Sequence, residues 1–406
     1  MSDRAFVFGY LPSATRPELV GQVIVLETGN AGFCRFKYAP SWLADPKAFP
    51  LDPELLPLDT HEFESQPGWE VFSALRDAGP DHWGRKVIER RLGRVGLTEL
   101  EFLLAASEQR VGALGFSTER SPRQAKASVP PAHRLADLMQ AAAHLERDEP
   151  IASDLLALLG EGSGTLGGMR PKATVEQGGE LWVAKFPAKD DRHAITRWEH
   201  ATLALAGRCG IRVPRHALVE VGSRAVLMTL RFDRDRRADG FARGHLLSGL
   251  TMLGLHERDY GAGGYADLAA WLRRHGAMPR GDARELFQRM VFNVVVGNSD
   301  DHLRNHAAMD FGDGFRLSPA FDLVPQPASG TGRRQAIGVG DLGREATLEN
   351  ALTQAGQFGL DEKEAATLVR TLRTTIARSW RKAFVASGVM GTELDAIKAL
   401  VALTGE

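Results

Sequence analysis

Apolar and polar residues alternate over short distances near the start of the chain, which is typical of half-buried β-strands. Turns that contain Gly or Pro separate three predicted strands, which cover residues 5–8, 21–26 and 32–38. Apolar residues then recur every three or four positions, which is the spacing of a helix that buries one face. This spacing predicts helices over residues 70–92, 97–107, 134–146 and 151–159.

The second part of the chain has strands and one helix, followed by long helical stretches. Strand-like runs cover residues 181–186 and 217–232, and a helix is predicted between them at 194–209. Helical spacing returns over residues 264–296 and 360–386. The pattern predicts an α+β fold with two lobes that follow one another as in a protein kinase: strands with one helix come first, and a mostly helical C-terminal lobe comes second. A small β-rich N-terminal domain precedes the two lobes.

The composition is that of an ordinary globular protein. The chain has 406 residues, of which 43% are hydrophobic and 25% charged, so more than one domain is expected. A formal net charge of −1 gives no electrostatic reason to expect nucleic-acid or membrane binding by the whole protein. Cys34 and Cys209 fit no metal-binding spacing, which predicts reduced cysteines in a cytoplasmic protein. No signal peptide or membrane-spanning run is expected.

One polar loop carries residues suited to phosphoryl transfer. It contains Asp300 and, five positions later, Asn305. This is the spacing of the kinase loop H-R-D-x-x-x-x-N, in which the Asp accepts the proton of the substrate hydroxyl and the Asn holds Mg²⁺. Asp322 follows a predicted hairpin over residues 307–317, which would return it beside Asn305 as a second metal ligand. Asp301 leaves the identity of the base open, although the spacing to Asn305 favours Asp300.

A glycine-rich loop and a strand lysine form the ATP side of the predicted site. Residues 160–168 contain five glycines, so their backbone can approach a phosphate closely. The glycines predicted to contact the nucleotide are Gly164, Gly167 and Gly168. Lys185 lies in a strand-like run, from which it can reach the phosphates of ATP. Glu199, in the next predicted helix, is the expected partner that orients this lysine.

The polar loop also has two other interpretations. Asp and Asn favour turns, so a loop after a buried helix can contain them for structural reasons alone. Asp300, Asp301, His302 and His306 could instead serve a metal-dependent hydrolase, although the chain has no H-E-x-x-H or paired-cysteine pattern.

Several motifs, taken in order, resemble those of the HipA family, which are serine/threonine-kinase toxins of bacterial type II toxin–antitoxin systems. In the first part of the chain, the similar segments are residues 33–38, 79–85 and 110–116. In the second part, they are residues 168–172, 183–187, 230–234, 297–305 and 321–322. The resemblance covers most of the chain. The predicted division is an N-terminal domain (1–117), a linker with a helix (118–150), an ATP-binding region (151–235) and a helical lobe (236–406).

The resemblance implies an ATP- and Mg²⁺-dependent serine/threonine protein kinase. Asp300 would be the catalytic base, and Asn305 and Asp322 would bind Mg²⁺. Lys185 would contact the ATP phosphates.

The same resemblance implies two further sets of residues. The backbone around Phe232 and Asp233 would line the adenine side of the nucleotide cleft. Thr165 or Ser163 would be the hydroxyl in the glycine-rich loop whose phosphorylation silences the enzyme. Asp301 departs from the family pattern, in which glycine is common at this position.

The resemblance also implies partners. A small helix-turn-helix antitoxin that binds DNA would inhibit the protein, so DNA would be contacted only indirectly. The substrate would be a protein, and some family members phosphorylate an aminoacyl-tRNA synthetase. The alternatives are a small-molecule kinase of the same fold and an inactive corepressor that works through the antitoxin.

Overall fold

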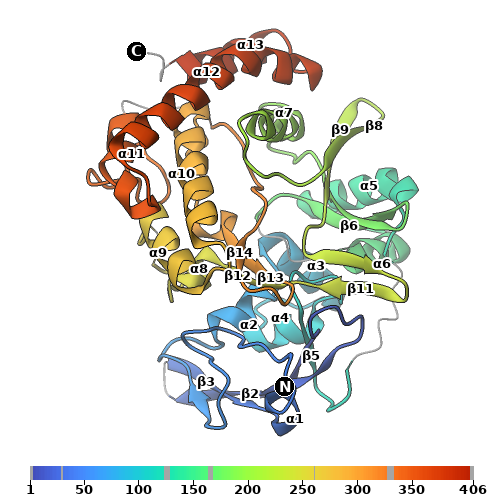
Figure 1. Cartoon of the computed structure of the whole chain (residues 1–406). Helices are drawn as coiled ribbons and strands as arrows, with labels where there is room; N and C mark the ends of the chain where they lie inside the picture. Colours follow the sequence, from blue (N-terminus) through green and yellow to red (C-terminus); the bar gives the residue numbers. More distant parts are fainter. Residues whose placement is uncertain are drawn as a thin grey trace. The chain divides into compact units, whose positions relative to one another are not determined.

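The chain forms two compact units, whose helices and strands are labelled in Figure 1. Unit 1 comprises residues 1–189, 230–247 and 309–313, and unit 2 comprises residues 190–229, 248–308 and 314–406. The computed structural model describes residues 3–28, 31–122, 129–162, 168–259, 261–326 and 333–402. No helix in these described ranges is both long and apolar enough to cross a membrane.

Unit 1 begins with an antiparallel sheet of five strands in the order β4-β3-β2-β1-β5. These strands are β1 (Arg4–Gly9), β2 (Glu18–Thr28), β3 (Ala31–Tyr38), β4 (Phe63–Glu64) and β5 (Leu114–Ser117). Val7, Val23 and Phe36 are fully buried along its three longest strands, as expected when one strand face packs on a core. The three strands predicted from alternation are therefore confirmed, and two edge strands are added.

Two helices, α2 (Ser73–Asp77) and α3 (His82–Leu92), replace the single helix predicted over residues 70–92. That prediction was wrong because Pro80 cannot donate a backbone hydrogen bond and disfavours helix in the residue before it. Asp81 then starts α3 as its N-cap, since its side chain accepts a hydrogen bond of 2.7 Å from a backbone amide in the first turn.

The rest of unit 1 consists of short helices and antiparallel strand pairs. Its remaining elements are α1 (Pro40–Leu43), α4 (Glu99–Ala105), η1 (Ala132–Arg134), α5 (Leu135–Glu146), α6 (Ser153–Gly162), β6 (Lys172–Gln177), β7 (Glu180–Lys185), β10 (Arg234–Arg237), β11 (Gly240–Arg243) and β12 (His245–Ser248). α4 packs on β1 and β5, whereas α6 packs on α3, α5 and β6. The β6–β7 hairpin carries Lys185 at its end.

Unit 2 is mostly helical and is built around α10 (Pro279–Val296), which packs against α9 (Tyr265–His275) and α12 (Glu362–Ala386). Its other elements are α7 (Ile195–Arg208), β8 (His216–Val221), β9 (Arg224–Leu230), α8 (Gly249–Met252), η2 (Leu303–Asn305), β13 (Ala307–Asp310), β14 (Arg316–Leu317), α11 (Leu348–Thr353), η3 (Ala355–Phe358) and α13 (Thr392–Ala402). The helical spacing predicted over residues 264–296 is confirmed as two helices, because the chain leaves the helix at Gly276 and starts again with Pro279.

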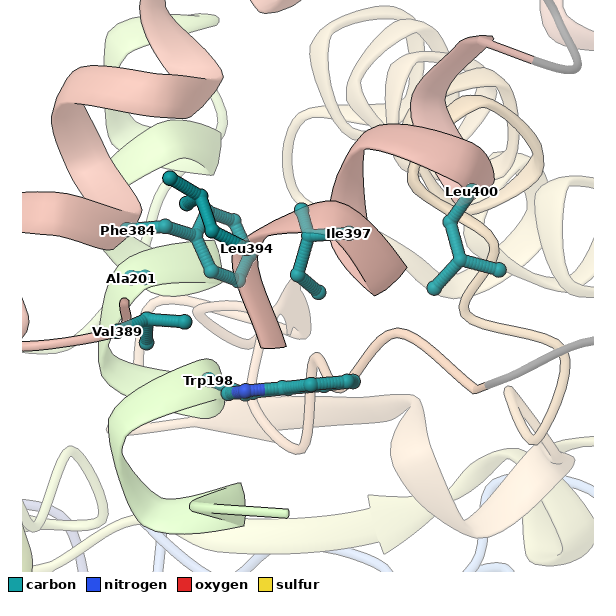
Figure 2. Close-up of a cluster of buried hydrophobic side chains, with 7 residues drawn as sticks. All are labelled: Trp198, Ala201, Phe384, Val389, Leu394, Ile397 and Leu400. Carbon is teal, nitrogen blue, oxygen red and sulfur yellow. The ribbon is translucent and has the colours of Figure 1, made fainter. Parts of the chain in front are cut away.

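The last helix, α13, is held by an apolar cluster that the sequence pattern did not predict. Figure 2 shows its side chains converging from α7, α12 and α13. The members of this α13 cluster are Trp198, Ala201, Phe384, Val389, Leu394, Ile397 and Leu400. Ile397 is 1% exposed, so its side chain is fully packed.

Replacing Ile397 by valine is expected to lower the free energy of unfolding by about 1 kcal/mol, because one buried methyl group is lost from a packed site. Urea denaturation would measure the change. Lys398→Arg, at an exposed position of the same helix, is the matched control and should leave the stability unchanged. Equal stability of the valine variant and the wild type would contradict the packing of α13 in this cluster.

Candidate active site

The polar loop begins where α10 ends, at Gly297. This glycine has φ +74°, in the left-handed region, and it turns the chain out of a helix that is buried on nearly all sides. The loop is then held by its own backbone. The amide of His302 donates to the carbonyl of Asp300 at 2.9 Å, and the amide of Asn305 donates to the carbonyl of His302 at 2.9 Å. The short helix η2 therefore fixes Asn305 relative to Asp300.

Asp301 is the buried anchor of this loop, with 1% of its surface exposed. Its Oδ2 accepts hydrogen bonds from Asn293 Nδ2 at 2.7 Å, from His306 Nε2 at 2.9 Å and from the Tyr265 hydroxyl. A second amide, that of Asn298, donates to Asn293 Oδ1 at 3.1 Å and extends the network. Asp301 thus joins the loop to α9 and α10.

The environments of the two adjacent aspartates, Asp300 and Asp301, differ in burial and in hydrogen bonding. Burial alone would raise the pKa of Asp301, but the charge of His306 and the hydrogen bonds from His306 and Tyr265 hold it below its usual range. The Asp301 carboxylate is therefore ionised, and it accepts hydrogen bonds that hold the loop in place. Asp300 is exposed, and within the described parts of the chain no comparable set of hydrogen bonds anchors its carboxylate. The geometry favours Asp300 as the residue that meets a substrate.

Asp300 also has the electrostatic environment of a general base. Partial loss of its hydration raises its pKa above the usual value, and this is the largest effect. His302 lowers the pKa, whereas the negative charges of Asp322 and Asp301 raise it further. A carboxylate whose pKa is shifted upward is a better proton acceptor when a substrate hydroxyl loses its proton.

Asn305 is oriented by the loop that it closes. Its Nδ2 donates to the backbone carbonyl of Asp300 at 3.2 Å, and only 7% of the residue is exposed. Because the amide nitrogen is engaged there, the direction of the amide oxygen is set as well. Amide and carboxylate oxygens are the ligands that Mg²⁺ prefers, so Asn305 suits the metal-binding role predicted for it.

Asp322 returns to the same region of unit 2. The amide of Ser318 donates to the carbonyl of Ala307 at 2.8 Å, which brings the chain after β14 back beside the loop. Asp322 has φ +59°, one of few non-glycine residues among the described ones in the left-handed region. Such a backbone costs on the order of 1–3 kcal/mol, is less unfavourable for Asp than for most residues, and is found often at functional sites. The carboxylate and the strained backbone fit a metal ligand.

Replacing Asp322 by glycine is expected to abolish phosphoryl transfer, because the carboxylate that would hold Mg²⁺ is lost, and to relieve the cost of a positive φ, which glycine adopts without strain. Thermal denaturation and a transfer assay would measure the two effects. Ser13→Gly is the matched control, since Ser13 has φ 66° in unit 1 and should show the stability effect alone. Full transfer by the Asp322 variant would exclude this residue from the metal site.

The hydrolase interpretation of the loop finds no support in the structure. Among the residues that the structure describes, no group of three or more His, Cys, Asp or Glu side chains is placed to hold a metal ion. His306 and Asp301, two members of the proposed hydrolase set, are instead buried and bound to each other.

The other predicted site residues are divided between the units. Lys185 ends β7 in unit 1, and Glu199 is buried in α7 of unit 2 with 2% exposure, so their pairing stays a prediction. The first residues of the predicted glycine-rich loop, 160–162, are the end of helix α6, so the loop begins later than predicted. Gly168, at its other end, has φ +100°. The remaining loop residues with predicted roles, Ser163, Gly164, Thr165 and Gly167, lie outside the described residues.

Asp233 is fully buried in a cluster of charges within unit 1. Its carboxylate accepts from Arg231 Nη2 at 2.8 Å, from Arg234 Nη1 at 2.7 Å and from the amide of Gly112 at 2.9 Å. Burial would raise its pKa, but the two arginines hold the pKa well below the usual range. The side chain of Asp233 is therefore structural, and the backbone role predicted for Phe232 and Asp233 stays a prediction.

A buried ion pair anchors the chain just after the glycine-rich segment. Lys172 Nζ donates to Asp81 Oδ2 at 2.7 Å and to the carbonyl of Gly168 at 3.2 Å, and the Trp83 indole donates to the Lys172 carbonyl at 3.0 Å. Asp81 also caps α3. Residues 79–85 and 168–172, which both resemble segments of the HipA family, are thus in contact within unit 1.

Sequence reasoning missed the residues that hold Asp301. Tyr265, Asn293 and His306 are 36, 8 and 5 positions away from it. One signal was present, because Asn293 is a single polar residue in the apolar run of residues 290–296 and a buried polar group needs a partner. The sequence pattern gave no indication of which partner it would find.

Both parts of the chain match models of known protein domains. Residues 164–380 match the model of the HipA-like C-terminal domain, and residues 15–117 match that of the HipA N-terminal domain. A curated protein of Sinorhizobium fredii named "Putative kinase Y4mE" is 31% identical over 147 residues, which are 35% of this chain and 34% of that protein. A "Putative kinase" of Haemophilus influenzae is 24% identical over 150 residues, 34% of this chain and 43% of that protein. The chain thus spans less than half the length of either curated relative.

A solved structure is similar over nearly the whole chain. It is HipA of Shewanella oneidensis MR-1 in a toxin–antitoxin complex with HipB and operator DNA. The TM-score is 0.73 at 17% sequence identity, and the match covers 98% of this chain and 96% of that one. The predicted α+β fold is confirmed as that of the solved HipA. Since the C-terminal model alone matches more than half of the 406 residues, the chain belongs to the HipA family.

Proposed function

We propose that the protein is an ATP- and Mg²⁺-dependent serine/threonine protein kinase that acts as the toxin of a toxin–antitoxin pair. The observation that supports this proposal is the difference in burial between the two adjacent aspartates of the polar loop. Asp301 is buried and anchors the loop, which leaves Asp300 exposed beside an oriented Asn305 and near Asp322. This is the set of side chains that phosphoryl transfer to a hydroxyl requires.

In this proposal, Asp300 orients the substrate hydroxyl and accepts its proton. The hydroxyl oxygen forms a bond to the γ-phosphorus of ATP, the bond from that phosphorus to the β–γ bridging oxygen breaks, and ADP leaves. Asn305 and Asp322 would hold Mg²⁺, which neutralises charge on the phosphates when bound. Lys185, oriented by Glu199, would contact the same phosphates, and Gly168 with the neighbouring glycines would cover them. Positioning and charge neutralisation would supply most of the rate.

The proposed partner is a DNA-binding antitoxin. The solved HipA with the same fold is part of a complex with HipB and operator DNA, which supports this context for the present chain. The net charge of −1 agrees with a protein that reaches DNA through its partner. The proposed substrate is a protein, with an aminoacyl-tRNA synthetase as the first one to test.

The test separates substrate classes. Wild-type protein, ATP labelled at the γ-phosphate and Mg²⁺ are incubated with a cell extract divided into protein and metabolite fractions, with Asp300→Asn as the blank. Labelled serine or threonine in proteins is expected. Label in the metabolite fraction alone would favour a small-molecule kinase. An absence of both transfer and thermal stabilisation by ATP with Mg²⁺ would favour a corepressor that has no enzymatic activity.

A further inference from the structure

A small pocket in unit 2 lies against the loop that carries Asp300. Its volume is about 170 Å³. Its apolar lining is formed by Leu250, Ala262, Leu303, Ala336 and Ile337. His302 and Arg304, which belong to the loop itself, also line it. The predicted catalytic roles use neither this pocket nor these apolar side chains.

The size of the pocket matches one side chain rather than a nucleotide or a cofactor. An apolar cavity of about 150 Å³ is large enough to hold a benzene molecule. A pocket of 170 Å³ therefore suits one leucine, methionine or phenylalanine side chain. Ala336 and Ile337 are 3% and 2% exposed, so the apolar wall is fixed by the fold.

The pocket also lies close to Asp300. His302 and Arg304, which line it, are two and four residues beyond Asp300, and each residue advances at most about 3.5 Å. These two lining residues are therefore no more than about 7 Å and about 14 Å from Asp300 along the backbone. An extended peptide advances about 3.3 Å per residue, so it would place a side chain here within about four residues of its acceptor hydroxyl.

The charges at the pocket are of both signs. Glu257 contacts Arg304, so these two charges offset each other. The Asp259 carboxylate accepts the backbone amide of His256 at 2.8 Å. The guanidinium of Arg344 lies beside Gly261, since a Cβ added to this glycine would be 2.8 Å from Arg344 Nη1. No single sign of charge dominates the pocket, which leaves its apolar lining to select the occupant.

An occupant would act on the catalytic geometry as well as on affinity. Leu303 is buried in η2, the same turn that places Asn305 against Asp300. A side chain packed on Leu303 therefore contacts the turn that orients the site. Binding energy gained away from the reacting atoms can in this way be used for positioning.

From these observations we propose that the pocket takes one apolar side chain of the protein substrate, within about four residues of the phosphorylated serine or threonine. This inference rests on the proposed function, because it assigns a substrate-recognition site to the same kinase.

The experiment is a positional scan of peptides with a central Ser or Thr, in which each flanking position in turn carries each amino acid. The wild type is expected to prefer an apolar residue about tenfold over alanine at one position, within about four residues of the centre. Ala262→Leu fills the pocket and should remove that preference through a higher KM for the apolar peptide.

The matched control is Ala377→Leu, which adds the same bulk at an exposed position of α12 and should keep the wild-type preference. Transfer to peptides without an apolar preference at these positions, or a preference that survives Ala262→Leu, would overturn the inference and leave the kinase assignment standing. No transfer to any peptide or protein, while ATP and Mg²⁺ still stabilise the wild type, would overturn the proposed function and this inference together.

Discussion

Replacing Asp301 by alanine is expected to lower the free energy of unfolding of unit 2 by at least about 1–3 kcal/mol, the usual cost of leaving a buried donor without its acceptor. The variant removes the acceptor that His306, Tyr265 and Asn293 share, so their donors are left unused in a dry environment. Phosphoryl transfer should fall as well, because the loop that orients Asp300 loses its link to α9 and α10. Urea denaturation and a transfer assay would measure both effects.

Two further variants make this prediction specific. Asp301→Asn keeps the shape of the side chain and one acceptor, so it should be less destabilising than alanine. Asp267→Ala, at an exposed position of α9, is the matched control and should cost less than about 1 kcal/mol. If Asp301→Ala were as stable as the wild type and yet inactive, Asp301 rather than Asp300 would be the base.

The case of Asp301 shows where sequence reasoning stops. The spacing of Asp300 and Asn305 is local, and it was enough to predict the loop as the catalytic one. Which of two adjacent aspartates is buried depends on Tyr265, which comes from another helix 36 residues away. Side-chain spacing within a loop contains no information about that contact. Burial therefore had to come from the structure.

The helices show the same limit at their ends. Apolar spacing predicted most of them, but the run over residues 70–92 hid a break at Pro80, and the run over 264–296 hid one at Gly276. Both breaks occur at residues that disfavour helix, so they were within reach of the sequence. The helix α13 was missed for a different reason, since much of its packing comes from Trp198 and Phe384 on other helices.

Local motifs predicted segments better than they predicted contacts. Asp81 and Lys172 lie in two segments that each resembled one family, but only the fold shows that they form a buried ion pair of 2.7 Å. The backbone of Asp233 was predicted to line the nucleotide site, which stays a prediction, and only the fold shows that its side chain pairs with Arg231 and Arg234. A charged residue in a motif can serve the fold, and burial distinguishes that use from a direct role in chemistry.

Replacing Asp300 by asparagine is expected to lower kcat about 10²- to 10⁴-fold, the usual contribution of a positioned general base. The amide can still hydrogen-bond the substrate hydroxyl, but it cannot accept its proton. The free energy of unfolding should be unchanged or slightly higher, because Asp322 and Asp301 repel the Asp300 carboxylate and raise its pKa. ATP with Mg²⁺ should still stabilise the variant against heat, which separates lost chemistry from lost binding.

The control for Asp300→Asn is Asp313→Asn, the same change at an exposed turn, which should leave both kcat and stability at the wild-type level. The comparison with Asp301→Asn completes the test, because the two adjacent positions should respond in opposite ways. The exposed Asp300 should affect rate without stability, and the buried Asp301 should affect stability first. Wild-type kcat in Asp300→Asn would show that the chain transfers phosphate without this base, and the assignment of the loop would have to be abandoned.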